Sequence, residues 1–423
     1  MMKTLKNNTP LRGIFLILLV FTIQSCRFKG TESSAVKDNV YNFVQVATGQ
    51  VSLYDEDGDV IKAVVPGDSL FGQDANYLTG KKMSFEKNGD GTVADLNTGL
   101  VWQEIPTSEG FDWQGAYEYC ENLELGGYHD WRMPTVKELF SISDFSSGWP
   151  YLDTNHFSLV NNENPDKSEQ YWSSNKYVGH TEEGGFHAAF GVNHVTGHIK
   201  AYRAEAGIGE KAHKGPPEGH QPPPGQGPPP GNGGKPMGNP LFKHVRAVRG
   251  SIYGTNDLQD NKNGTITDKA TGLMWSKNDS GKGLNWESAL SYAENSELAG
   301  YSDWRLPNVK ELQSIVDYSF APNAKNPKQV GPSIDPMFSC SEISNENGDK
   351  DYPYYWTGTS ARFQKGKPYY YAWYVAFGRA VNKEGLDFHG AGAVRFDAKH
   401  EDGPASEGGE RYYNYVRLLR NVD

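Results

Sequence analysis

Apolar and polar residues alternate along several short runs in the first quarter of the chain. The clearest runs are residues 51–54, 60–65 and 100–102, and turns rich in Gly, Asn and Asp separate them. Alternation with a period of two predicts half-buried strands, and Asn-Gly or Asp-Gly pairs supply the positive φ angles that tight hairpins need. The pattern therefore predicts small antiparallel sheets.

Two helices are expected after these strands. Apolar residues recur at helical spacing between residues 113 and 123, directly after Asp112, whose residue type favours the N-cap position. Cys120 lies on the apolar face, so we expect it to be buried as a small hydrophobic residue. A second helix should begin at Val136, because Thr135 and Glu138 have the spacing of a capping box.

The same pattern occurs twice along the chain. Residues 90–145 align without gaps with residues 263–318, and 28 of these 56 pairs are identical. A repeat of this length indicates two copies of one domain. The best-matched stretch holds an Asp-Trp-Arg-x-Pro motif in each copy, formed by Asp130, Trp131, Arg132 and Pro134 and by Asp303, Trp304, Arg305 and Pro307.

This motif has two interpretations. It could bind a ligand, or it could hold a buried Trp beside an Asp–Arg pair that fixes the entry to the second helix. Turn-forming glycines precede it at residues 126–127, and the capping box follows at residues 135–138. Because turn and cap signals surround the motif, we favour the structural role.

Shorter matches extend the repeat beyond residue 318. They pair Tyr171-Trp172 with Tyr355-Trp356, Ala189-Phe190-Gly191 with Ala376-Phe377-Gly378, and the closing segment 245–249 with 416–420. We therefore predict an α+β fold with two tandem domains, each containing an antiparallel sheet and two short helices.

The expected domain limits follow from the closing segments. The first domain is placed at residues 40–250 and the second at residues 251–423. Residues 206–240 are rich in Pro and Gly and too poor in apolar residues to fold on their own. Because they precede a closing segment, we interpret them as a loop inserted into the first domain.

The N-terminus carries the features of an export signal. Residues 1–25 combine a basic start with a short apolar run, and Ile23-Gln24-Ser25-Cys26 resembles a bacterial lipobox. We expect Cys26 to be acylated, which would anchor the chain to a lipid bilayer through a tether of residues 26–39. The alternative is an ordinary secretory signal with an incidental Cys. The expected location is the bacterial envelope, at the outer membrane or cell surface.

Charge narrows the range of partners. The formal net charge is −11, and it becomes −14 when the three basic residues of the signal segment are removed. An acidic surface argues against nucleic acid as a partner, although it leaves room for a local basic patch. Cys120 and Cys340 occupy non-equivalent positions in the two copies. Two free thiols are therefore favoured over a bridge between the domains.

The combined motif resembles the Lcl C-terminal-domain-like family, named for the C-terminal domain of a collagen-like bacterial adhesin. The resemblance implies two tandem C-type-lectin-like domains on an exported protein. For the adhesin member it implies binding of sulfated glycosaminoglycans. Leu53, Ala63 and Ala247 stand where family members often carry Cys, so the family's disulfides are absent here. No ligand residue of the family can be matched to a position in this chain.

Catalytic and metal-binding motifs are weak. Asp55, Asp57 and Asp59 could provide oxygen ligands for Ca²⁺, but the EF-hand pattern is incomplete and an acidic hairpin turn explains them equally. A cluster of His187, His194 and His198 lacks the spacing of a zinc site. No nucleophile elbow, phosphate-binding loop or dinucleotide fingerprint occurs. We therefore expect neither an enzyme nor a resident cofactor.

Two functional hypotheses remain. The first is a lectin-like adhesion module that binds a glycan or a surface protein through aromatic residues in its variable loops. The second is a structural or assembly lipoprotein of the envelope without a soluble ligand. The aromatic candidates, each of which has core packing as its alternative role, are Trp149, Tyr151, Tyr354, Tyr369 and Tyr371.

Overall fold

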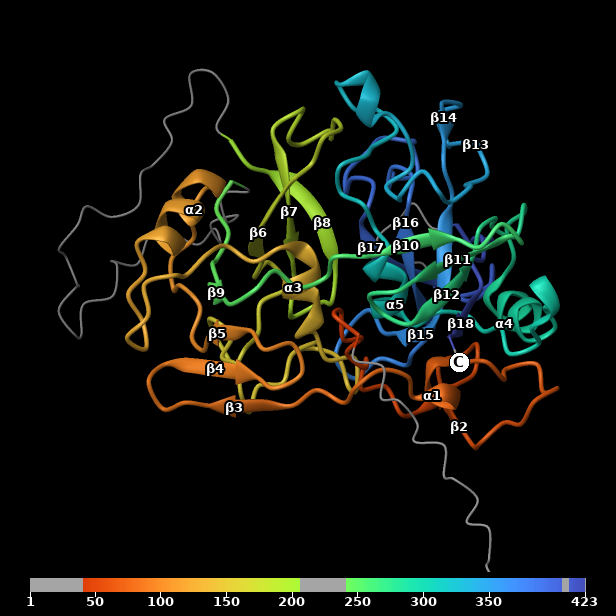
Figure 1. Cartoon of the computed structure of the whole chain (residues 1–423), viewed down its shortest axis with the longest axis horizontal. Coiled ribbons are helices and arrows are strands. Elements are labelled where there is room, and N and C mark those ends of the chain that lie inside the picture. Colours follow the sequence, from red (N-terminus) through yellow and green to blue (C-terminus); the bar gives the residue numbers. More distant parts are fainter. Residues whose placement is uncertain (1–40, 206–240, 405–410, 423) are drawn as a thin grey trace, which may run out of the picture. The chain divides into compact units, whose positions relative to one another are not determined.

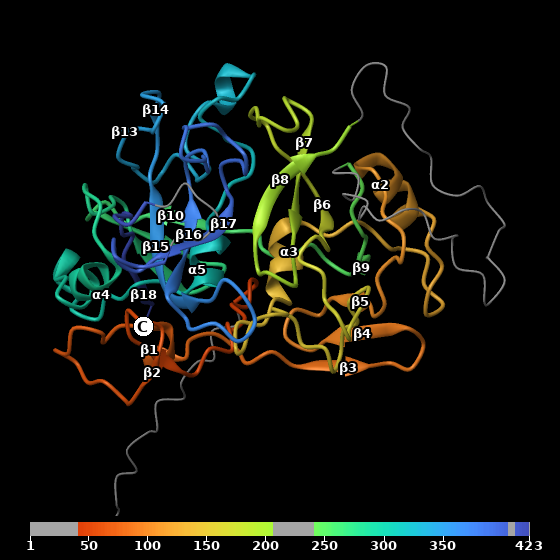
Figure 2. The same ribbon diagram turned by 180° about the vertical axis from the view of Figure 1, so that it is seen from behind.

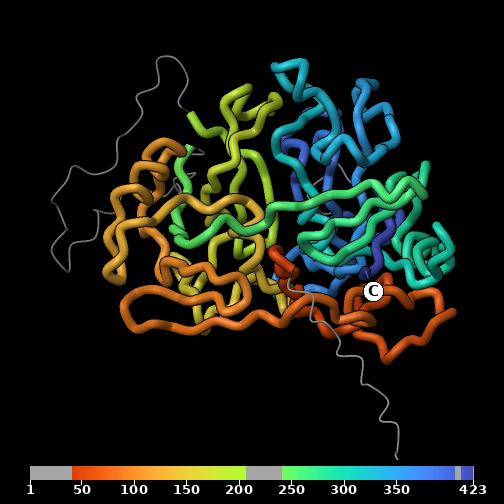
Figure 3. Tube along the Cα trace, in the orientation of Figure 1, coloured from red at the N-terminus to blue at the C-terminus, as the bar shows by residue number. Residues whose placement is uncertain are grey.

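Short antiparallel strands and short helices build the protein, whose computed structural model describes residues 41–205, 241–404 and 411–422 (Figures 1 and 3). The described residues from Tyr41 onward form a single compact unit. The predicted signal peptide, Cys26, the tether and the Pro/Gly-rich loop at 206–240 lie outside the described residues. We refer below to residues 41–250 as the first copy and to residues 251–422 as the second copy.

In chain order the elements are β1 (Leu53–Tyr54), β2 (Val60–Ile61), α1 (Asp74–Tyr77), β3 (Phe85–Lys87), β4 (Thr92–Asp95), β5 (Val101–Gln103), α2 (Trp113–Glu121), α3 (Val136–Ser141), β6 (Tyr171–Lys176), β7 (Ala188–Val192), β8 (Ile199–Arg203), β9 (Val248–Arg249), β10 (Leu258–Asp260), β11 (Thr265–Asp268), β12 (Leu273–Ser276), α4 (Trp286–Glu294), η1 (Leu298–Gly300), α5 (Val309–Ser314), η2 (Pro327–Gln329), β13 (Ile343–Ser344), β14 (Lys350–Asp351), β15 (Tyr354–Ala361), β16 (Tyr371–Ala376), β17 (Val394–Ala398) and β18 (Leu419–Asn421).

Each copy contains a small four-stranded antiparallel sheet. The strand orders are β3-β4-β5-β9 in the first copy and β10-β11-β12-β18 in the second. The turn between β3 and β4 uses Gly89 and Gly91 at φ angles of 78° and 87°, values that a residue without a Cβ adopts readily. In both copies the last strand comes from the closing segment, so this sheet brings the two ends of each copy together. The predicted small antiparallel sheets are confirmed.

A six-stranded antiparallel sheet joins the two copies. Its order is β15-β16-β17-β8-β7-β6, so three strands come from each copy (Figures 1 and 2). The join lies between β17 and β8, where Val394 is paired with Ile199. The two copies therefore share one continuous sheet.

Hydrogen bonds show which positions of this sheet are equivalent. Ser173 Oγ donates to the carbonyl of Phe190 over 2.7 Å, and Thr357 Oγ1 donates to the carbonyl of Trp373 over 2.8 Å. Phe190 thus corresponds to Trp373, and the sequence match of Phe190 with Phe377 was wrong. The short triplet around Phe377 is a local likeness only, because strand register is set by cross-strand bonds and by the buried face.

The same register identifies an axis of internal symmetry. Ile199 pairs with Val192, two residues after Phe190, and Val394 pairs with Val375, two residues after Trp373. Ile199 and Val394 are therefore equivalent positions that face each other. An approximate twofold axis passes between them and relates the two copies.

The helices begin where the caps predicted. Asp112 Oδ1 accepts a 2.7 Å bond from the amide of Gly115 at the start of α2, and the capping box of Thr135 and Glu138 is complete at α3. The second copy repeats both features, with Asn285 capping α4 and Asn308 capping α5. These starts are confirmed, and they place two short helices in each copy in addition to α1.

Both predicted free thiols are present. Cys120 is fully buried and Cys340 is partly buried, and neither forms a disulfide. Burial in the apolar layer under α2 raises the pKa of the Cys120 thiol to about 12. The second copy carries Ala293 on the same helix face, which is also fully buried. Cys120 therefore acts as a small packing residue.

The Asp-Trp-Arg motif is structural, but its charges pair differently from our expectation. Trp131 is buried, and its Nε1 donates to the carbonyl of Leu125 over 3.2 Å. Arg132 does not bind Asp130; it forms a bidentate pair with Glu138, at 2.7 and 2.6 Å. Glu138 is the capping-box residue of α3, so this pair fixes the helix start.

The motif's aspartate reaches the closing strand instead. Asp130 pairs with Arg249 of β9 over 2.7 Å, and Asp303 pairs with Arg420 of β18 over the same distance. The other motif residues behave alike in the second copy: Trp304 is buried, and Arg305 binds Glu311 at 2.8 Å through both nitrogens. The motif thus connects the helix start to the four-stranded sheet.

The prolines of the Asp-Trp-Arg-x-Pro motif connect this motif to the six-stranded sheet. The carbonyl of Pro134 accepts from the amide of Ser174 in β6 over 2.8 Å, and the carbonyl of Pro307 accepts from Gly358 in β15 over 2.9 Å. A single stretch in each copy therefore holds the helix and both sheets in one arrangement.

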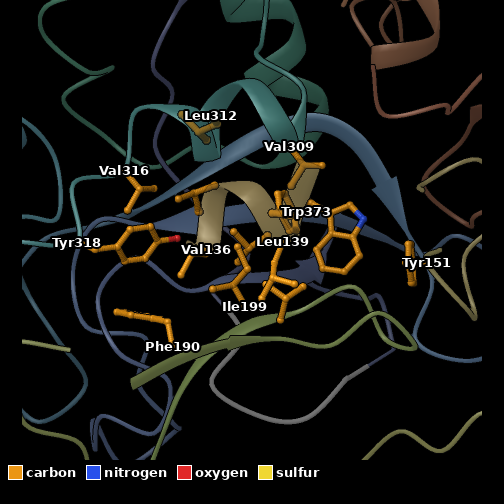
Figure 4. Packing of buried hydrophobic residues seen from close by; sticks show 14 of the residues in the cluster. Val136, Leu139, Tyr151, Phe190, Ile199, Val309, Leu312, Val316, Tyr318 and Trp373 are labelled. Atoms are coloured by element: carbon orange, nitrogen blue, oxygen red, sulfur yellow. The ribbon is translucent and has the colours of Figure 1, made fainter. Parts of the chain in front are cut away.

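The main hydrophobic core spans both copies. Helices α3 and α5 pack against each other and against the six-stranded sheet. In Figure 4, Val136 and Leu139 of α3 lie with Val309 of α5, Ile199 of β8 and Trp373 of β16. Smaller apolar clusters lie on the outer face of the sheet, one near α2 and one near α4.

The N-terminal segment crosses to the second copy. The amide of Phe43 donates to the carbonyl of Ala270 over 2.9 Å, and Gln50 Nε2 donates to the carbonyl of Ser360 over 2.9 Å. In return, the amide of Tyr253, at the start of the second copy, donates to Glu138 of the first over 3.0 Å. Each copy is therefore completed by chain from the other.

Candidate functional site

A cleft of 260 Å³ lies beside the junction of β8 and β17. Residues of both copies line it, and we call it the junction cleft. Its charged and imidazole-bearing walls are formed by Lys167, His198, Lys200, His389 and Arg395.

Two of these cationic side chains project away from the core, because successive side chains of a strand point to opposite faces of the sheet. The residues on either side of Lys200 and of Arg395 belong to the main hydrophobic core, so Lys200 and Arg395 project from the opposite face of the sheet. They also directly follow Ile199 and Val394. Lys200 and Arg395 are therefore equivalent positions, one from each copy, on the two sides of the twofold axis.

The cleft is locally basic in an acidic chain. Lys167, Lys200 and Arg395 line it, and in the part of the chain that the structure describes no carboxylate lines it. The whole chain has a net charge of −11. Glu183 binds Lys200 over 3.2 Å from outside the lining. A concave surface carrying one sign of charge concentrates the field of that charge.

Burial and this basic potential together lower the pKa of His389. Burial, and then the charges of Arg395 and Lys200, hold the pKa of His389 well below its ordinary value. Its Nδ1 lies 3.1 Å from the carbonyl of Ala380. The imidazole is therefore neutral at physiological pH and offers hydrogen bonds without adding charge.

Aromatic rings complete the walls. Trp149, Tyr202 and Phe363 line the cleft, and the Tyr202 ring centroid lies 5.3 Å from Lys200 Nζ and 4.9 Å from Lys243 Nζ. Flat rings beside cations and amides can pack on a sugar ring while the polar groups bind its hydroxyl or acidic substituents.

Only Trp149 of the five predicted aromatic residues lines this cleft. Tyr151 and Tyr354 have no exposed surface, and Tyr371 and Tyr369 expose 3% and 7%. Tyr354 stacks on Tyr374 inside the second copy, with ring centroids 4.5 Å apart. These four tyrosines have no open face for a sugar, so the core alternative describes them.

The loop that carries Trp149 joins the copies. Arg362 Nη2 donates to the carbonyl of Gly148 over 2.7 Å, and Tyr369 Oη donates to the carbonyl of Ser147 over 2.7 Å. Trp149 Nε1 donates to the carbonyl of Arg362 over 3.3 Å. The aromatic-rich loops therefore hold each other in place, and this explains why most of their rings are buried.

The other sequence candidates do not come together. Asp55 Oδ1 accepts a 2.8 Å bond from the amide of Asp59 within the β1–β2 turn, as a hairpin aspartate does. His194 is buried beside Ser143, whereas His187 is exposed and pairs with Glu205. Among the residues that the structure describes, no group of three His, Cys, Asp or Glu side chains could hold a metal ion.

Sequence reasoning missed Lys200 and Arg395. Both are basic residues at polar positions of alternating strands, which was a visible signal. The sequence did not show that these two residues lie close together. Strands β8 and β17 are separated by nearly 200 residues, and they belong to different copies.

Fold and site together define an internally duplicated α+β protein with a basic, aromatic-lined cleft at its approximate twofold axis. The Lcl C-terminal domain model matches residues 91–208 and 264–396, more than half of the chain. The chain belongs to this family and carries two copies of its domain, so the predicted membership is confirmed. Searches of curated proteins and of solved structures found no match. Within the described ranges, no helix is both long and apolar enough to cross a membrane.

Proposed function

We propose that the protein is an exported, lipid-anchored adhesion protein that binds an acidic glycan in the junction cleft. In this proposal each copy is a C-type-lectin-like domain, acylated Cys26 holds the chain at the envelope, and the protein acts by binding rather than by catalysis. Family membership supports an adhesin-related role. The placement of Lys200 and Arg395 on either side of the twofold axis is the observation that carries the choice of ligand.

The chemistry of the cleft favours an anionic polymer over a neutral one. Lysine and arginine form charge-assisted hydrogen bonds with carboxylate and sulfate groups, and these bonds are stronger than those between neutral groups. Trp149 and Tyr202 supply rings for the apolar face of a sugar. Two cations from two copies fit a ligand that carries acidic groups at more than one point, as a polysaccharide does.

The test measures binding of the full-length protein, solubilised in detergent, to immobilised heparin, hyaluronan and dextran. Binding should follow acidic character and be absent for neutral dextran. The double variant Lys200→Gln/Arg395→Gln should weaken binding by roughly tenfold or more, because each lost charged hydrogen bond contributes about 1.5–3 kcal/mol. Lys62→Gln/Lys82→Gln is the matched control, because it removes the same charge outside the cleft.

Two results would contradict the proposal. One is equal loss of binding in both double variants, which would indicate nonspecific attraction. The other is an absence of binding to every glycan, while the folded protein still binds a partner from the envelope. That second result would favour a structural or assembly lipoprotein.

A further inference from the structure

A second cleft of 400 Å³ lies between the copies on the side of α3 and α5. The chain from β9 to β10, which runs from one copy to the other in Figure 1, forms part of its wall through residues 252–256 and Leu258. We call it the linker cleft. Lys137 of the first copy and Asp317 and Asp335 of the second also line it. Its volume is within the range of small-molecule sites.

Backbone pairing places both aspartates on one face. Val316 and Ile334 form an antiparallel bridge, and both side chains belong to the main core. Their neighbours Asp317 and Asp335 therefore point the opposite way, as diagonal neighbours on the cleft side. Asp317 Oδ1 accepts from Ser319, and Asp335 Oδ1 accepts from the amide of Met337 over 2.8 Å.

The first copy contains the same arrangement. Ser143 and Leu152 form the equivalent bridge, so Asp144 and Asp153 correspond to Asp317 and Asp335. Asp153 Oδ1 likewise accepts from the backbone two residues later, over 3.0 Å. The difference is at Oδ2, where His156 Nδ1 lies 2.6 Å from Asp153. The first copy therefore provides its own nitrogen partner for this carboxylate.

The second copy lacks that partner. Phe338 corresponds to Phe157, because Arg246 lies over the Phe157 ring and its counterpart Arg417 lies over the Phe338 ring. The turn from Asp335 to Phe338 is therefore one residue shorter than the turn from Asp153 to Phe157, and none of the described second-copy side chains takes the place of His156. Phe338 is buried in the core. Within the described ranges no hydrogen bond or ion pair reaches Asp335 Oδ2, and Asp335 is one of the residues that line the open linker cleft.

The lysine on the opposite wall is already engaged. Lys137 Nζ donates to the carbonyl of Gly254 over 3.1 Å and to Asn256 Oδ1 over 2.8 Å. Burial lowers its pKa to about 8, and the nearby charge of Asp317 opposes that shift. Lys137 therefore partly compensates Asp317, and Asp335 is the carboxylate that remains for a ligand.

We propose that the linker cleft binds an organic cation, an ammonium or guanidinium group on an apolar stem, whose N–H donates to Asp335 Oδ2. The stem would pack on Ile252, Leu258 and Met337, which line the same cleft. The ligand nitrogen takes the place that His156 fills in the first copy. This site is independent of the glycan proposed for the junction cleft.

The test is an NMR titration of the full-length protein in detergent with benzylammonium and benzylguanidinium. Benzyl alcohol serves as the neutral analogue of the ammonium probe. Both cations should bind and the alcohol should not. Asp335→Asn keeps the acceptor for the Met337 amide, and it should weaken cation binding by roughly fivefold or more. Asp153→Asn at the equivalent position is the matched control and should leave binding unchanged.

A second variant inserts the missing partner. Met337→His places an imidazole directly before the equivalent phenylalanine, as His156 directly precedes Phe157. It should also weaken cation binding, with a thermal melt to establish that the variant is folded. The proposal is overturned if the cations do not bind, if benzyl alcohol binds equally well, or if Asp335→Asn leaves the affinity unchanged.

Discussion

Ile199 and Val394 are equivalent residues of the two copies, and they pair with each other at the centre of the six-stranded sheet. A residue that meets its own counterpart marks a twofold relationship, which is the geometry of a symmetric dimer interface. Here both halves are in one chain. The chain thus forms an internal dimer with a shared core and a cleft at its axis.

The shared core predicts cooperative unfolding. Ile199 is fully buried in a cluster that contains residues of both copies. Urea unfolding followed by fluorescence should therefore show a single transition, and Ile199→Ala should lower the stability of both copies together by about 2–5 kcal/mol. Two separate transitions, with only the first copy affected, would show that the copies fold independently.

The Arg–Glu pair of the motif predicts unequal mutational effects. Arg305 and Glu311 expose 5% and 2% of their side chains, whereas Asp303 exposes 57%. Arg305→Met leaves the buried Glu311 carboxylate without its cationic partner and should cost about 3–5 kcal/mol of unfolding free energy. Asp303→Asn removes the charge of an exposed side chain but keeps an oxygen that can accept from Arg420, so it should cost at most about 1 kcal/mol. Similar losses in denaturant melts would contradict this assignment.

A buried carboxyl between the copies predicts a dependence on pH. Asp387 accepts hydrogen bonds from Tyr177 Oη of the other copy over 3.0 Å and from the amide of Gly390 over 2.8 Å. Burial raises its pKa to about 7, above the value of about 3.9 in an unfolded chain. The folded state therefore binds a proton that the unfolded state releases, so this group's contribution to stability falls as pH rises from about 4 to 7.

Asp387→Asn tests that dependence. The wild-type protein should lose up to about 4 kcal/mol of unfolding free energy from this group across the window, and the variant should lose that much less. Unfolding curves in urea at pH 4 and pH 8 measure the difference. Parallel pH profiles for the two proteins would contradict the assignment.

The burial of Cys120 predicts that its thiol reacts slowly with thiol-specific reagents. Because burial raises its pKa to about 12, the folded protein should not react at Cys120 with a thiol-specific reagent until it unfolds. Cys120→Ala, which copies the residue of the second repeat, should change stability by no more than about 1 kcal/mol. Rapid labelling of Cys120 in the folded state would show that it is accessible.

Local features could be predicted from the sequence. Asp112 and Thr135 begin their helices because capping depends on residues three positions apart, and Gly89 and Gly91 form their turn for a similarly local reason. The burial of Trp131 also followed from its surrounding turn and cap signals.

Relationships that depend on the path of the chain or on contacts between the copies could not be predicted. The pairing of Arg132 with Glu138, rather than with Asp130, depends on how the chain turns into α3. The burial of Tyr369 depends on contact with Ser147 in the other copy. The junction cleft requires β8 beside β17, and nothing in a repeated sequence shows whether the repeats stand apart or share a sheet.

Hydrogen–deuterium exchange tests most directly whether the junction of the copies forms the glycan site. The full-length protein would be compared with and without a heparin oligosaccharide. Protection should appear together in residues 193–202 of the first copy and residues 389–396 of the second, and Lys200→Gln/Arg395→Gln should abolish it. Protection confined to one copy, or located away from these segments, would contradict the account.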